Sequence, residues 1–100
     1  MTERSLTTTI ARALSDRGAW VFKVHGNGWQ RAGVPDLLVG YRGRLVGMEI
    51  KTQDGRVSPL QTREIESLRA AGCLAAVVRS KAEALDLLDS IDRADAAKEP

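Results

Sequence analysis

Hydrophobic positions along the chain switch between helical and strand spacing, and they predict a mixed α/β order of elements. Leu6, Ile10 and Leu14 recur every four residues, which is the spacing of one helix face. In the middle of the chain, two apolar runs flank the turn signal Arg42-Gly43, a pattern typical of a β-hairpin. The predicted elements are a helix at 3–17, a strand at 19–24, a hairpin within 35–51 with apolar runs at 37–39 and 45–50, a helix at 59–71, a strand at 74–78 and a helix from 81.

This order, αβββαβα, predicts an α/β fold in which residues 1–100 form a single domain. A right-handed crossover from the third strand through the second helix makes the third and fourth strands parallel. The sheet is therefore expected to be mixed, with helices on both faces. The last residues, DRADAAKEP from about 92 to 100, are expected to be a frayed tail, as chain ends often are.

The hairpin register predicts that two carboxylates lie side by side. If Arg42 and Gly43 are the two turn residues, counting back along both strands places Asp36 directly across from Glu49. Opposed residues of this kind have Cβ atoms about 4.5–5.5 Å apart. Lys51 is two residues beyond Glu49 and shares its face of the sheet. Because Arg disfavours positive φ, a three-residue turn with a bulge is an alternative that shifts this pairing.

Two carboxylates beside an ammonium group indicate a divalent metal site suited to attack on a phosphodiester. A single His25 and a single Cys73 cannot form a zinc site, so oxygen atoms have to be the metal ligands. The alternative is that the three charged side chains form an ordinary surface salt-bridge cluster, worth only about 0–1 kcal/mol.

Positive charge is concentrated in the middle of the chain, although the net charge is only +2 and the pI about 9.0. A basic region around two acids suits a polyanion such as DNA, and a chance scatter of charges is the alternative. The irregular loop at 25–33 supplies Trp29, which either stacks on a base or anchors the loop. The candidate DNA-binding residues are Lys23, His25, Trp29, Arg31 and Arg42.

Two further polar residues have both a structural and a functional interpretation. Glu3 lies in the first turn of the first helix, where the helix dipole alone favours an acid, and it also faces the core side. Gln61 completes a capping box with Ser58, and it also begins the buried stripe of the second helix, within reach of the carboxylates.

Cellular location follows from what the chain lacks. No apolar run approaches the roughly 18 residues of a membrane span, and the start has no signal-peptide core. The single Cys73 suits a reducing compartment. The sequence therefore predicts a cytoplasmic protein with no membrane partner.

Pro35-Asp36, followed by Glu49-x-Lys51 at the end of the next strand, resembles the signature of the PD-(D/E)xK nucleases. The order αβββαβ is the restriction-endonuclease-like core of that superfamily. With SPLQ opening the second helix, the chain resembles the virus-type replication-repair nuclease (VRR-NUC) family in its compact stand-alone phage and bacterial form. The resemblance covers about Glu3 to Ile91.

The resemblance implies roles for individual residues. Asp36 and Glu49 correspond to ligands of Mg²⁺ or Mn²⁺, with the backbone carbonyl of Ile50 as a third ligand. Lys51 orients the attacking water or stabilises charge on phosphorus. The implied catalytic residues are Glu3, Asp36, Glu49, Lys51 and Gln61, with Glu3 as a further metal ligand.

The resemblance also implies a function. The protein is expected to be a metal-dependent DNA endonuclease, selective for junctions or flaps, acting as a homodimer in replication, recombination or repair, in the cytoplasm of a bacterium or phage-infected host. The alternatives are a catalytically silent DNA-binding module with the nuclease fold, and a metal-free interaction or regulatory domain.

Overall fold

A computed structural model describes residues 1–25 and 31–98 of the chain. Its helices and strands follow the predicted order, which confirms the fold class. The elements are α1 (Glu3–Asp16), β1 (Trp20–Lys23), β2 (Leu37–Tyr41), β3 (Arg44–Ile50), α2 (Pro59–Ala70), β4 (Leu74–Val78) and α3 (Lys81–Lys98).

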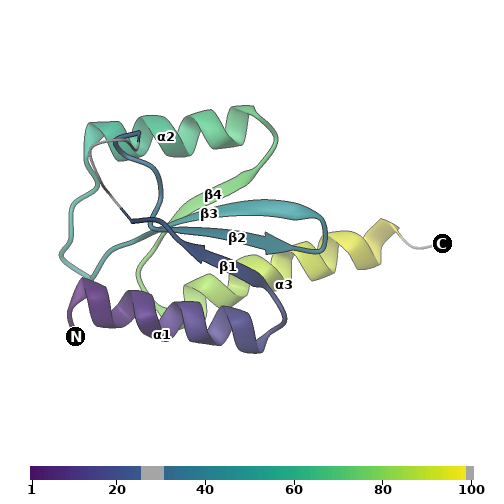
Figure 1. Ribbon diagram of the computed structural model, residues 1–100. Helices are drawn as coiled ribbons and strands as arrows, with labels where there is room; N and C mark the ends of the chain where they lie inside the picture. The colour runs from purple at the N-terminus through teal and green to yellow at the C-terminus, as the bar shows by residue number, and fades with distance from the viewer. Residues whose placement is uncertain (26–30, 99–100) are drawn as a thin grey trace.

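The four strands form one sheet in the order β1-β2-β3-β4. β2 pairs antiparallel with both β1 and β3, whereas β3 and β4 run parallel. Figure 1 shows α2 on one side of the sheet and α1 with α3 on the other. The predicted mixed sheet with helices on both faces is therefore confirmed.

The core lies between the sheet and the α1–α3 pair. The predicted stripe of Leu6, Ile10 and Leu14 is buried along α1. Alternate residues of β2 and β3 meet it, because successive side chains of a strand point to opposite faces. The buried core cluster comprises Leu6, Ile10, Leu14, Leu37, Val39, Val46, Met48, Ile50, Val78, Ala84, Leu88 and Ile91.

The hairpin adopts the tight two-residue turn. Arg42 has φ +48° and Gly43 has φ +77°, so both residues are left-handed, as a type I′ turn requires. Tyr41 pairs with Arg44, and Leu37 pairs with Met48. The predicted register is confirmed, and its continuation by one step sets Asp36 opposite Glu49.

The expected frayed tail is wrong for the residues up to 98, because α3 remains helical to Lys98. The physical reason is a set of ion pairs between α3 and the hairpin turn. Arg42 Nε lies 2.8 Å from Asp92 Oδ1, and Arg44 Nη2 lies 2.6 Å from Asp95 Oδ1. These contacts hold a part of α3 that has few apolar side chains of its own.

Among the residues that the structure describes, no helix combines the length and the apolar character needed to cross a lipid bilayer.

Candidate active site

Three carboxylates meet at one end of the sheet. Each of Glu3, Asp36 and Glu49 offers an oxygen atom, and these three oxygens lie within 4.8 Å of one another. The hairpin register brings Asp36 beside Glu49. Because α1 packs under the sheet, its first turn carries Glu3 to the same point. The structure thus gathers side chains from three separate segments.

Glu49 is the most buried member of this carboxylate cluster, with 1 % of the residue exposed. Its Oε2 accepts a hydrogen bond of 3.0 Å from Gln61 Nε2 and lies 3.6 Å from Lys51 Nζ. Its Oε1 is buried without a hydrogen-bond partner among the described residues. An unpaired buried carboxylate oxygen is costly, and a bound cation would satisfy it.

Asp36 is held by the backbone of the neighbouring strand. Its Oδ2 accepts a hydrogen bond of 2.8 Å from the Ile50 amide. This contact fixes the Asp36 side chain and brings the backbone of Ile50 next to the carboxylate cluster. The Ile50 carbonyl stays a predicted ligand. Three carboxylates form a hard oxygen donor set, which suits Mg²⁺ or Mn²⁺, so the residues present fit such an ion.

The environment of Glu49 changes its protonation. Burial, together with repulsion from Asp36, raises the pKa of Glu49 to about 8, and Lys51 offsets part of this rise. Without a bound cation, Glu49 therefore holds its proton at neutral pH, and cation binding has to displace that proton.

Gln61 performs both of the roles that the sequence suggested. Its backbone amide donates to Ser58 Oγ at 3.2 Å, and its Oε1 accepts from the Ser58 amide at 2.9 Å, which completes the capping box. Its Nε2 remains free to donate to Glu49 Oε2. The cap thus aims the side-chain amide of Gln61 at the cluster.

A cavity of about 500 Å³ lies beside the carboxylate cluster. Two of the predicted DNA-binding residues, Lys23 and His25, line this cavity. Sequence reasoning missed Arg4 and Thr7, although a signal was available for Thr7, which lies four residues after Glu3 and so shares its side of the helix. The lining residues are Glu3, Arg4, Thr7, Lys23, Val24, His25 and Asp36.

The other predicted DNA contacts are not brought to the cluster. Arg42 occupies the hairpin turn, at the opposite end of the β2–β3 pair, where Asp92 neutralises it. Arg31 forms an ion pair with Glu64 of α2. Trp29 lies outside the described residues.

No family model and no curated protein matches the chain. Among solved structures, it resembles a "VRR_NUC domain" with a TM-score of 0.72 and 29% sequence identity, over 89% of this chain and 97% of the other. It also resembles a "VRR_NUC domain protein" with a TM-score of 0.71 and 21% identity, over 92% of this chain and 86% of the other. Both likenesses extend over most of the fold described above.

Proposed function

Because the chain is a VRR-NUC domain, we propose that it is a metal-dependent DNA endonuclease. The observation that carries this proposal is the buried Glu49 oxygen that lacks a partner in the described part of the chain, at the centre of three carboxylates. All the side chains of the motif, Asp36, Glu49 and Lys51, are present together. This favours an enzyme over a catalytically silent DNA-binding module.

Asp36, Glu49 and Glu3 would hold Mg²⁺ or Mn²⁺, with the Ile50 carbonyl as a further ligand. When bound, such an ion lowers the pKa of water and offsets negative charge on a phosphate. The cluster is well prepared for this role because Gln61 fixes one Glu49 oxygen, while the other has no hydrogen-bond partner in the described part of the chain.

The remaining chemistry belongs to side chains of the protein. Lys51 is a fixed cation next to Glu49, with only 11 % of its side chain exposed, so it can stabilise charge that grows on the reacting phosphate. Lys23, His25 and Arg4 line the adjacent cavity, where cationic or polar groups can bind neighbouring phosphates.

The family supports a finer proposal for the substrate, namely branched or flapped DNA that arises in replication, recombination or repair. The test is incubation of the protein with labelled single-stranded, flap, nicked, duplex and four-way DNA. We expect cleavage of the branched forms with Mg²⁺ or Mn²⁺ and none with EDTA. The matched control is Asp36→Asn, which keeps the side-chain shape but removes one acid. DNA binding without cleavage under every metal condition would favour the silent module.

We also propose that the domain acts as a homodimer. Trp20 is 62% exposed and Phe22 is 45% exposed, and their rings stack 6.0 Å apart on β1, an edge strand. Exposed edge strands pair readily with another strand, and a second copy brought by a two-fold axis offers the same strand.

Light scattering after size-exclusion chromatography tests this arrangement. The wild type is expected to have the mass of two chains, and the variant with Trp20→Ser and Phe22→Ser the mass of one. A matched variant with Leu60→Ser, at a 47% exposed position on α2, should remain dimeric. A monomeric wild type at tens of micromolar, or a variant that stays dimeric, would rule the arrangement out.

A further inference from the structure

One side of α1 carries a polar stripe that leads away from the active-site cavity. Arg4, Thr8 and Arg12 follow one another at intervals of four residues, so they share one side of the helix. All three are exposed. Arg4 lines the cavity beside the carboxylate cluster, and Arg12 lies two turns further along.

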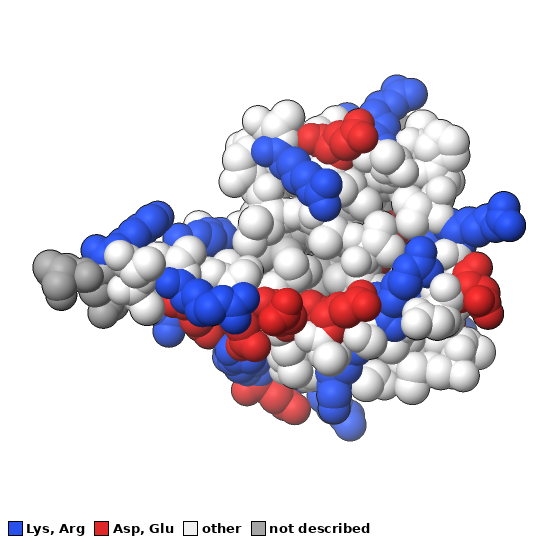
Figure 2. All heavy atoms as spheres, turned by 180° about the vertical axis from the view of Figure 1, so that it is seen from behind, with Lys and Arg blue, Asp and Glu red and all other residues white. Residues whose placement is uncertain are grey.

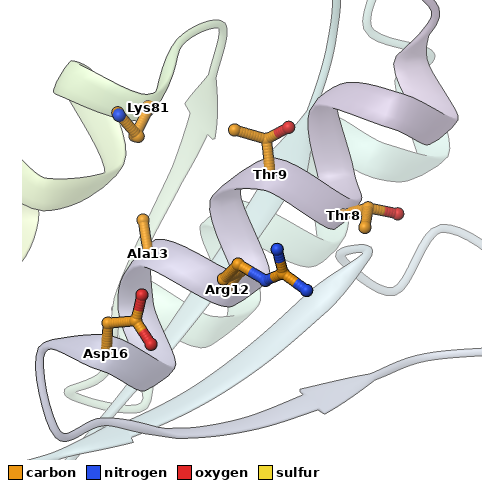
Figure 3. Close-up of a pocket in the computed structure, with 6 residues that line it drawn as sticks. All are labelled: Thr8, Thr9, Arg12, Ala13, Asp16 and Lys81. Atoms are coloured by element: carbon orange, nitrogen blue, oxygen red, sulfur yellow. The ribbon is translucent and has the colours of Figure 1, made fainter.

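Arg12 lines a second cavity of about 330 Å³ at the junction of α1 and α3. Figure 3 shows Lys81 projecting from α3 across from Thr9 and Ala13 of α1. Two cations and two hydroxyl groups therefore border one hollow, and Asp16 is the single acid on its rim. The lining residues are Thr8, Thr9, Arg12, Ala13, Asp16 and Lys81.

The pairing of the cations distinguishes this stripe from the other end of α1 and from the hairpin turn. Within the residues that the structure describes, Arg4, Arg12 and Lys81 form no ion pair. By contrast, the cations at the other end of α1 and in the hairpin are neutralised by acids of α3. The pairs are Arg17 with Asp89 and Asp92, Arg42 with Asp92 and Asp95, and Arg44 with Asp95.

The acids of α3 also restrict the direction from which a polyanion can approach. Figure 2 shows acidic side chains in a row along α3, on the side opposite to the view in Figure 1. Because these acids pair with Arg17, Arg42 and Arg44, the three arginines are not available to a DNA backbone on that side. Arg4 and Arg12 of α1, together with Lys81 at the start of α3, place positive charge at the active-site cavity and at the second cavity.

We propose that the second cavity is a subsite for the DNA backbone, and that the α1 stripe guides the strand to it from the reacting phosphate. The chemistry fits, because guanidinium, ammonium and hydroxyl groups all donate hydrogen bonds to phosphate oxygens. This subsite rests on the proposed nuclease function and specifies the surface that holds the duplex to one side of the cut.

The spacing predicts the length of DNA that is held. Arg4 and Arg12 are eight residues apart, which corresponds to about 12 Å along the helix axis. Successive nucleotides of a duplex strand are about 3.4 Å apart along its axis. The subsite therefore contacts phosphates about three to four nucleotides from the reacting one, and it requires DNA that extends at least that far.

The test uses a variant with Arg12→Ala and Lys81→Ala, both at exposed positions outside the catalytic cluster. DNA affinity is measured by fluorescence anisotropy in EDTA, over a series of salt concentrations. We expect Kd to rise about tenfold at 0.1 M salt and the slope of log affinity against log salt to decrease by about two. With Mg²⁺, KM should rise while kcat stays unchanged.

The matched control also removes two charges, through Arg93→Ala and Lys98→Ala on α3, and its Kd should stay within twofold of the wild type. Arg12→Lys with Lys81→Arg should retain most of the affinity. Shortening the duplex to two base pairs on one side of the cut should raise the Kd of the wild type by the same factor as the double-alanine substitution does. The Kd of the double-alanine variant should not rise further.

The outcomes separate the subsite from the function itself. Wild-type affinity in the double-alanine variant, or equal weakening in the α3 control, overturns the subsite while the nuclease function stands. If the wild type neither binds nor cuts any DNA, the proposed function fails instead.

Discussion

Replacement of Lys51 by alanine is expected to lower the rate of DNA cleavage by about 10²–10³-fold. The Lys51 ammonium lies 3.6 Å from Glu49 Oε2, and in the proposed mechanism it is the cation held beside the reacting phosphate. The fold should persist, because the backbone contact from the Lys51 amide to the Val78 carbonyl, at 3.0 Å, does not involve the side chain. The measurement is a single-turnover rate at saturating DNA and Mg²⁺, together with a circular dichroism spectrum.

A second readout distinguishes this role from a structural one. Lys51 lowers the pKa of Glu49, so its loss should raise that pKa and shift the remaining activity toward higher pH. Lys98→Ala, at the far end of α3, is the matched control and should cleave normally. Cleavage by Lys51→Ala at the wild-type rate would remove Lys51 from the mechanism.

Replacement of Glu49 by glutamine is expected to abolish cleavage and yet to stabilise the metal-free protein at alkaline pH. Burial and the neighbouring Asp36 raise the pKa of Glu49 from its ordinary value of 4.5 to about 8. A group whose pKa is raised on folding contributes stability below its unfolded pKa and loses it as pH rises through the folded pKa. The wild type should therefore lose stability between about pH 5 and pH 8, and the neutral glutamine should not.

The size of this effect follows from the pKa shift. One pKa unit corresponds to about 1.4 kcal/mol, so the wild type should lose about 2 kcal/mol relative to Glu49→Gln between pH 6 and pH 8. For a domain of this size, that loss corresponds to a difference in Tm on the order of 10 °C. The measurement is thermal unfolding in EDTA across this pH range.

Addition of Mg²⁺ or Mn²⁺ provides the complementary comparison. It should raise the Tm of the wild type, because an ion bound only to the folded state stabilises it, and it should leave Glu49→Gln unchanged. Glu66→Gln, at an exposed position on α2, serves as a control. Its Tm should depend on pH and rise with Mg²⁺ or Mn²⁺ as the Tm of the wild type does. If the Tm of the wild type and the Tm of Glu49→Gln changed with pH in the same way, the surroundings of Glu49 would not raise its pKa.

The central part of the site could be predicted because it depends on local rules. A two-residue turn at Arg42-Gly43 and the two-residue period of a strand are sufficient to set Asp36 across from Glu49. The contact from Gln61 to Glu49 was anticipated for a similar reason, since Ser58 and Pro59 fix where α2 begins.

Other features depend on contacts between distant segments and could not be derived from the pattern. Glu3 reaches the cluster only because α1 packs under the sheet. The sequence shows many cations in the middle of the chain, but it does not show which ones are neutralised. Arg42 meets Asp92, 50 positions later in the chain, and this contact both removes Arg42 from the candidate DNA surface and extends α3.

The position of Glu3 in the first turn of α1 has a practical consequence for experiments. An affinity tag fused directly before Met1 would emerge only two residues from a carboxylate of the cluster, where it could obstruct substrate or capture the ion itself. The C-terminal end of α3 lies on the other side of the molecule from Glu3, at the right in Figure 1. Recombinant protein for kinetic work is therefore best purified through a carboxy-terminal fusion or a cleavable leader.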